Sequence, residues 1–282
     1  MTTVSFSGIT FDDQSVDGFH LSKLVGWYDA PAARFDADDR PQGDGKFRQK
    51  RVYRSARVVS VEGSWTGSSV TDAYAAREQL MAVQASGAES SFTVADPLGV
   101  RSSSVSLTTA PTADDGLYQP FFKFAFDVVA PDPVKYGQAQ SQTTPVPTPS
   151  SGLVWPLGSS SPYFNWGTAG NTGQISLTNA GTAQSWPSLT VAGGLSGGFI
   201  LTWVPTGDQL IYSVPIPDGS SVNLNSRTGR ATMNGASDVT GFLTTSNWWS
   251  LAAGQTGLVQ FTPVGTQTGT PTLTGAVAPG YL

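Results

Sequence analysis

Residues 57–86 of the chain, RVVSVEGSWTGSSVTDAYAAREQLMAVQAS, contain the two patterns that decide its fold class. In the first half, the apolar residues Val59, Val61 and Trp65 alternate with polar ones. Such alternation is the pattern of a strand that buries one face, because successive side chains point to opposite faces of a sheet. We therefore expect residues 47–65 to form a long strand.

The second half of this stretch has a helical pattern. Over residues 71–86, apolar and long side chains recur at intervals of three and four residues, which places them on one face of a helix. Thr71 can serve as the N-cap, and Gly87 stands where a left-handed residue often ends a helix. No other segment has an equally clear pattern, so we expect a single helix that covers one face of a sheet.

The rest of the chain has the composition of an all-β protein. Only 12% of its 282 residues are charged, while glycine and proline number 32 and 19. Such a chain favours short strands joined by tight turns over long helices. Further strands are expected within 4–28 and at 90–95, 103–108, 120–130, 162–166, 173–178, 186–192, 198–204, 209–214, 220–225, 229–233, 247–251, 257–262 and 272–278. The expected fold is mainly β, with two β-sandwich domains, the N-terminal one carrying the helix on a sheet.

The charge distribution divides the chain into two domains. Residues 1–135 hold 13 of the 15 lysines and arginines. Residues 136–152 are uncharged and rich in proline, serine, threonine and glutamine, which is typical of a semi-extended linker. We therefore expect an N-terminal domain over 1–135, a linker over 136–152 and a C-terminal domain over 153–282.

Residues suited to catalysis are scarce. The chain has no cysteine, and its single histidine, His20, lies within an expected strand, where a local hydrogen bond is its ordinary role. The motifs of zinc proteases, serine hydrolases and phosphate-binding loops are absent. The C-terminal half has only Asp208, Asp218 and Asp238 as carboxylates, which does not favour a glycosidase pair. The sequence predicts no catalytic residue and no enzyme.

Metal, cofactor and membrane binding are not expected either. The run Asp36-Ala-Asp38-Asp39 has Arg40 and Pro41 where an EF-hand needs an oxygen ligand and a glycine, so it is interpreted as a solvated acidic loop. A net charge of −5 gives no electrostatic reason to bind nucleic acid or an anionic membrane. Neither a signal peptide nor a membrane-spanning apolar run is visible, so we expect a soluble product made in the cytoplasm.

One segment of the N-terminal half concentrates the charges. Residues 29–46 have no apolar periodicity and are predicted to form a long exposed loop, and a basic cluster from Lys46 to Arg57 follows directly. Alone, such a cluster could mark nucleic-acid binding. The neighbouring acidic loop instead favours mutual neutralisation within or between subunits. We expect an oligomer interface formed by Arg34, Asp36, Asp38, Asp39, Lys46, Arg48, Arg51, Tyr53, Arg54 and Arg57.

The C-terminal half is rich in aromatic residues. Trp248 and Trp249 are adjacent, so in a strand they would point to opposite faces, and one of them would lie outside the core of its own domain. An outward tryptophan marks either a contact with a partner protein or a platform that stacks on a sugar ring. Weak charge and many aromatics also resemble carbohydrate-binding modules, which is the alternative reading of this half.

Five segments, in chain order, resemble the distal tail protein family of long-tailed, non-contractile phages. They are RVVSVEGSWTG (57–67) followed by the helix AYAAREQL (73–80), FAFDVVAPDPVKYG (124–137), LTNAGTAQSWP (177–187), NSRTGRATMNG (225–235) and WWSLAAGQTGLVQF (248–261). Each is loose alone, whereas five in sequence are fairly specific. The second is similar to the end of the N-terminal domain in minor tail proteins of actinobacterial phages.

This resemblance implies a structural protein without catalytic residues. The N-terminal domains would form a hexameric ring, with galectin-like, jelly-roll sandwich domains displayed outside it. The ring would join the tail tube to other tail-tip proteins and the host-adsorption apparatus, and DNA would pass through its lumen without specific binding. A carbohydrate-binding module of a cell-wall-active protein is the alternative, and a glycan-degrading tail enzyme is disfavoured by the missing carboxylate pairs.

Overall fold

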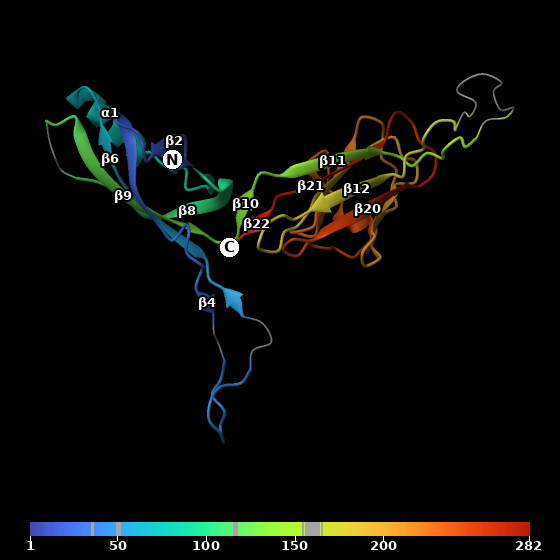
Figure 1. Ribbon diagram of the computed structural model, residues 1–282, viewed down its shortest axis with the longest axis horizontal. Coiled ribbons are helices and arrows are strands. Elements are labelled where there is room, and N and C mark those ends of the chain that lie inside the picture. Colours follow the sequence, from blue (N-terminus) through green and yellow to red (C-terminus); the bar gives the residue numbers. More distant parts are fainter. Residues whose placement is uncertain (35–36, 49–51, 115–117, 154, 156–163, 165) are drawn as a thin grey trace. The chain divides into compact units, whose positions relative to one another are not determined.

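The chain folds into two compact units, residues 1–137 together with Leu282, and residues 138–281. The structure, a computed structural model, describes residues 1–34, 37–48, 52–114, 118–153, 155, 164 and 166–282 (Figure 1). None of the helices in this described part is long and apolar enough to cross a lipid bilayer. The fold is mainly β, as the composition predicted.

The described residues of the first unit form ten strands and one helix. They are β1 (Thr3–Phe6), β2 (Ile9–Asp12), β3 (Gly18–Val25), β4 (Ala33–Arg34), β5 (Tyr53–Arg54), β6 (Arg57–Thr66), α1 (Val70–Met81), β7 (Ser90–Asp96), β8 (Gly99–Ala113), β9 (Phe121–Ala130) and β10 (Lys135–Gly137). The strand predicted over 47–65 is interrupted, because β5 belongs to a separate ribbon and only β6 continues in the main sheet.

The expected N-terminal sandwich is instead one sheet that closes on itself. Strands β8, β7, β1, β2, β3, β6 and β9 pair in that order, and β9 pairs again with β8. The long strand β8 makes this closure possible. Its first part pairs with β7 up to Val105, and its second part, from Ser106 onward, pairs with β9 through two register shifts. A closed sheet has no free edges among its ring strands.

The interior of this sheet is filled by aromatic and branched side chains. Val59, Val61 and Trp65 are buried on the inner face of β6, which confirms the alternation seen in the sequence. Phenylalanines from neighbouring strands pack in contact, with the Phe6 and Phe126 ring centroids 5.7 Å apart. His20 lies in β3, and its Nδ1 is 3.2 Å from the carbonyl oxygen of Ser15, the local hydrogen bond expected for it.

The helix is present but shorter than predicted. Ser69 rather than Thr71 is the N-cap, and its hydroxyl accepts a hydrogen bond from the Asp72 N–H. The helix ends at Met81 because Gln84 has a left-handed backbone, with φ of 50°, and its side chain turns toward β8. There it donates to the Val105 carbonyl at 2.8 Å and accepts from the Leu107 N–H at 2.7 Å.

The second unit consists of two sheets that share one hydrophobic core. Its elements are β11 (Gln140–Pro145), β12 (Gln174–Thr178), β13 (Ser188–Ala192), β14 (Phe199–Trp203), β15 (Asp208–Tyr212), β16 (Ser221–Asn225), β17 (Arg230–Met233), β18 (Ser237–Asp238), η1 (Thr240–Phe242), β19 (Leu243–Ser246), β20 (Thr256–Pro263), β21 (Thr272–Val277) and β22 (Gly280–Tyr281). The orders are β11-β21-β13-β16-β17-β18 and β12-β20-β14-β15-β19. Both sheets contribute to the core, for example through Leu224 and Leu201.

Two sequence predictions for this region differ from the structure, and a third falls largely outside the described residues. The segment 136–152, expected as a linker, contains β11, which pairs with β21 along its length. The sequence hid this strand because its side chains are almost all exposed and polar. Residues 247–250 are irregular rather than a strand. The strand expected at 162–166 falls largely outside the described residues, and Phe164 and Trp166 are not in a strand.

Candidate assembly site

A charged hairpin, residues 29–54, leaves the closed sheet between β3 and β6 (Figure 1). We call it the arm. At its base β4 and β5 pair as a two-stranded ribbon, with Ala33 opposite Arg54 and Arg34 opposite Tyr53. Each of the seven ring strands of the main sheet pairs with two neighbours, although β2 and β3 share a single residue pair, whereas among the described residues β4 and β5 pair only with each other. A two-stranded ribbon of this kind is suited to strand pairing with another chain.

Most described residues of the arm are exposed, and Pro31 at its base is buried. The interface residues predicted from the sequence are exposed at seven described positions: Arg34, Asp38, Asp39, Lys46, Arg48, Tyr53 and Arg54. Asp36 and Arg51 lie outside the described residues. Apolar side chains are exposed there as well, with Tyr53 61% and Phe47 55% accessible to solvent. Exposed rings on a charged hairpin are suited to contact with another protein surface.

Charge neutralisation within the arm is slight. Its one ion pair among the described residues joins Lys46 Nζ to Asp39 Oδ1 at 3.6 Å, and both side chains are largely in solvent. Backbone hydrogen bonds from Arg40 N–H to the Gly45 carbonyl and from Phe47 N–H to the Asp38 carbonyl close the hairpin around this pair. An exposed pair of this kind contributes roughly 0–1 kcal/mol.

Arg57 does not lie at the surface, which corrects its assignment as an interface residue. It is 2% exposed, because it begins β6 with its side chain on the inner face. Its Nη1 donates to the carbonyls of Gly26 (2.8 Å), Trp27 (3.1 Å) and Asp29 (2.6 Å), and its Nε donates to Pro133 at 3.1 Å. Arg57 therefore anchors the root of the arm from inside the unit.

A second buried cation, Lys135, adjoins this anchor and was missed by the sequence analysis. Its Nζ donates to the Trp27 carbonyl at 2.9 Å and lies 5.4 Å from the centre of the Trp27 ring. Burial, and then the charge of Arg57, lowers the pKa of Lys135 to about 8. Burial also lowers the pKa of Arg57. The one sequence feature that could have indicated its burial is that it is the only lysine or arginine in the proline-rich segment PDPVKY (131–136).

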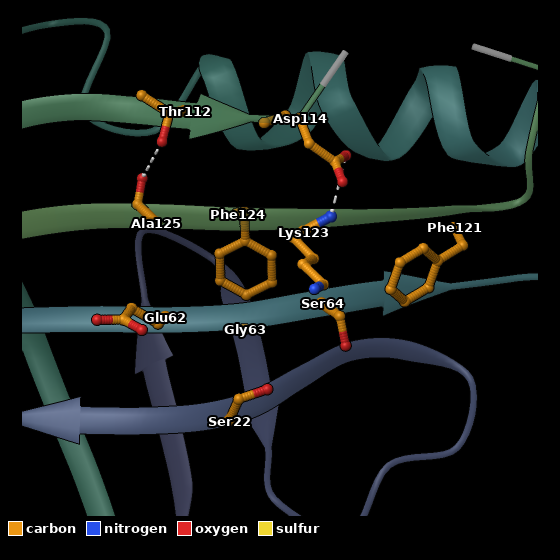
Figure 2. A pocket seen from close by; sticks show the side chains of 11 residues that line it. Ser22, Glu62, Gly63, Ser64, Thr112, Asp114, Phe121, Lys123, Phe124 and Ala125 are labelled. Atoms are coloured by element: carbon orange, nitrogen blue, oxygen red, sulfur yellow. Dashed lines mark hydrogen bonds between the residues drawn. The ribbon is translucent and has the colours of Figure 1, made fainter. Parts of the chain in front are cut away.

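A shallow hollow of about 600 Å³ lies on the outer face of β3, β6 and β9, beside the end of β8. Thr112 Oγ1 donates to the Ala125 carbonyl, and the Lys123 N–H donates to Asp114 Oδ1 (Figure 2). Polar groups of the last residues of β8 and of Asp114, which follows it, therefore bond to β9. Asp114 Oδ1 also lies 4.0 Å from Arg77 Nη2, at the limit of an ion pair.

The described residues that line the hollow do not place two carboxylates close together. Its lining includes no histidine, and Figure 2 shows Glu62 and Asp114 at opposite ends with Phe124 between them. Two separated carboxylates, each next to a cation, do not form an acid–base pair. Glu62 is 3.2 Å from Lys23. Across the described residues, no group of three or more possible ligands could hold a metal ion.

The structure also changes the assignment of the aromatic residues. Trp249 is buried and stacks on Trp203, with ring centroids 5.9 Å apart. Trp248 is half-buried against the same core. Neither side chain is open to stack on a sugar ring. Residues 247–250 are not in a strand, so the two tryptophans need not point to opposite faces, and both pack against the core. In the described part of the second unit, the exposed rings lie elsewhere, at Trp155, Phe164, Trp166 and Phe242.

Comparison with solved structures decides the fold. The crystal structure titled SPP1 Dit, described there as a paradigm of the hub adsorption apparatus in phages that infect Gram-positive bacteria, matches the whole chain with a TM-score of 0.65. The match covers 100% of both chains at 15% sequence identity. The chain has the Dit fold.

Two structures of the phage P2 baseplate in its activated conformation support the same assignment. The calcium form contains a chain that matches with a TM-score of 0.55 at 7% identity, covering 99% of this chain and 98% of that one. The strontium form gives a TM-score of 0.53 at 8% identity, covering 97% of both. No family model and no curated protein sequence matches. The distal tail protein resemblance proposed from five short segments is thus confirmed at the level of the fold.

Proposed function

We propose that this chain is a structural hub at the distal tip of a phage tail and has no catalytic turnover. The observation that carries the proposal is the agreement of the Dit fold over the full length of both chains, in SPP1 Dit and in the P2 baseplate. In this role the protein connects the tail tube to other tail-tip proteins and to the host-adsorption apparatus. It is a component of the virion, made in the host cytoplasm.

In this proposal the first unit assembles head-to-tail into a hexameric ring. A heterologous contact closes into a ring when its rotation fits, and the arm supplies one half of such a contact. Its open ribbon edges and exposed Phe47 and Tyr53 provide pairing and apolar burial, while its charges set the register. The ring lumen passes DNA without specific binding, in keeping with the net charge of −5.

The second unit, in the same proposal, is a galectin-like sandwich displayed outside the ring. We expect it to fold independently as residues 138–281, rather than as the 153–282 expected from the sequence, because β11 pairs with β21 and belongs to one of its sheets. The edge strands β11 and β12 of its two sheets are joined by a hydrogen bond. The Ser176 N–H of β12 donates to the side chain of Gln142 in β11 at 2.9 Å. A unit whose edges are covered in this way is suited to remain monomeric.

The arm supplies the test of ring assembly. We expect replacement of residues 35–52 by Asn-Gly, in the otherwise complete chain, to abolish the ring. The two pairs at the ribbon base would be joined by a tight turn of the type that suits two-residue hairpins, so the fold should persist. The measurement is particle mass by analytical ultracentrifugation, with thermal unfolding as the control for folding. A variant that still forms the ring would show that the interface lies elsewhere.

A further inference from the structure

Two positive charges are buried together at the root of the arm. Arg57 and Lys135 are each 2% exposed, and both donate to the same oxygen, the carbonyl of Trp27, at 3.1 and 2.9 Å. Two like charges held against one oxygen repel each other, and burial removes the water that would screen them. Buried charges in proteins are ordinarily offset by a charge of opposite sign.

The carboxylates near this pair do not supply that charge. Neither Arg57 nor Lys135 has an ion-pair partner among the described residues. Asp29 and Asp96 lie close enough to act on Arg57 and Lys135, respectively, but neither comes within ion-pair distance. The carboxylate of Asp96 instead accepts from the Tyr28 hydroxyl at 3.1 Å, and Asp29 is exposed.

The two cations also have hydrogen-bond donors to spare. Nε and Nη1 of Arg57 donate to carbonyls, whereas Nη2 is buried and has no hydrogen-bond partner within the described part of the chain. The Lys135 ammonium carries three N–H groups, and the Trp27 carbonyl is the one acceptor described for them. A single anion would meet both needs, because it accepts hydrogen bonds and carries the opposite charge.

We propose that Arg57 and Lys135 bind a small monovalent inorganic anion, of which chloride is the test case. The anion accepts from Arg57 Nη2 and from Lys135 Nζ. A monovalent ion suits a buried site, because removing a multivalent ion from water costs far more free energy. Arg57 also holds backbone carbonyls where the arm begins, so the bound anion stabilises that root. This site goes beyond the hub function and does not depend on ring assembly.

Anion binding should be coupled to the proton on Lys135. Burial, and then the charges of Arg57 and Arg101, lower the pKa of Lys135 to about 8, while Asp96 acts in the opposite direction. A bound anion favours the charged form of the lysine, so it raises this pKa toward the ordinary value. The affinity for the anion should therefore fall as Lys135 loses its proton at alkaline pH.

The test is urea unfolding of the full-length chain at about pH 7, with sodium gluconate replaced by sodium chloride at constant ionic strength, so that screening is unchanged. Gluconate is too large for a buried site between two side chains. An anion that binds only the folded chain stabilises it, and with a Kd of about 10 mM, about 100 mM chloride should raise the folding equilibrium constant roughly tenfold. The rise should be smaller at about pH 10, where Lys135 is largely neutral.

Lys135→Met should remain folded and lose most of the chloride response, because it removes one of the two charges that hold the anion. Lys123→Met is the matched control, since Lys123 is exposed on β9 of the same unit, and it should keep the full response. No chloride response in the wild type would overturn the proposal. So would a response that Lys135→Met retains, that Lys123→Met loses, or that is equal at both pH values.

Two further measurements locate the anion. Asp29→Asn should keep the chloride response, whereas a response seen only in this variant would identify the Asp29 carboxylate as the counter-ion and overturn the proposal. Crystals grown in sodium bromide should give an anomalous scattering peak next to Arg57 Nη2 and Lys135 Nζ. Peaks elsewhere, with none at this position, would mean that the stabilising anion binds at another site and would likewise overturn it.

Discussion

At the scale of single residues, the unusual feature is the pair of cations beneath the arm. The hydrogen bonds described for Arg57 and Lys135 all go to backbone carbonyls, of Gly26, Trp27, Asp29 and Pro133. Burying two positive charges costs free energy unless their donors are satisfied. Arg57 donates to four carbonyls, of Gly26, Trp27, Asp29 and Pro133, whereas Lys135 donates only to that of Trp27. Loss of Lys135 would leave the Trp27 carbonyl with its hydrogen bond from Arg57.

This difference leads to a prediction for two variants. Arg57→Met should destabilise the protein by about 3 kcal/mol, since it leaves several buried carbonyls without donors. Lys135→Met should change the stability by less than about 1 kcal/mol at neutral pH, because it removes the burial cost of a charge along with one hydrogen bond. Urea unfolding of the two variants, compared with the wild type, gives the values. Equal losses would mean that Lys135 is as necessary to the arm root as Arg57.

Lys135 should also make the stability depend on pH. Its pKa is about 8 in the folded chain, below the ordinary value of 10.5, so the unfolded chain binds the proton more tightly between these two values. Stability should therefore rise with pH across this window, by up to about 1.4 kcal/mol for each unit of pKa difference. Below pH 8, Lys135 is charged in both the folded and the unfolded chain, so the full cost of burying its charge lowers the stability of the fold. Lys135→Met should flatten the rise, which urea unfolding at about pH 7.5 and about pH 10 would reveal.

At the scale of elements, the closed sheet and the arm should differ in local stability. The ring strands are paired on both sides, while the ribbon β4–β5 has two open edges and few buried side chains. Amides in segments with little burial open easily, whereas those in core strands exchange only by large-scale unfolding. If the arm pairs with a neighbouring subunit, as proposed above, the exchange of its amides should slow on assembly.

Hydrogen exchange tests this contrast. In the dissociated chain, the amides of β4 and β5 should exchange within about tenfold of an unstructured peptide, while those of β6 and β9 stay protected. In the assembled ring the arm amides should become protected. Mass spectrometry of peptides from both states provides the comparison. An arm that remains unprotected in the ring would exclude strand pairing as its contact.

At the scale of the whole molecule, the charges of the arm should tune assembly rather than drive it. Arg48→Glu should weaken ring formation no more than about fivefold at low salt, because one exposed ion pair contributes roughly 0–1 kcal/mol, and the effect should vanish at high salt. Arg48 is preferable to Arg54, whose Nη1 also donates to the Pro31 carbonyl. Arg230→Glu, exposed in the second unit, is the matched control. A large, salt-independent loss would assign Arg48 to a buried contact.

The sequence alone determined the properties that depend on local spacing. Alternation located β6, β9 and most strands of the second unit, and short segments in chain order identified the Dit fold. Helical spacing located α1 and its start, although the helix expected over 71–86 ends at Met81. It also located the first part of the arm, residues 29–46, because a run of charges without apolar periodicity cannot form a buried element. Residues 47–54 were expected to continue into the long strand, and the structure places them in the arm instead. These features are set by a residue and its near neighbours in the chain.

Only the tertiary structure decided the properties that depend on pairing between distant residues. The closure of the sheet rests on register shifts in β8, the helix end on the reach of Gln84 to β8, and the burial of Arg57 and Lys135 on carbonyls from other segments. Trp249 points inward for the same reason, since Trp203 lies opposite it. No spacing rule predicts such contacts, because the partner of each side chain is brought into place only when the sheets form.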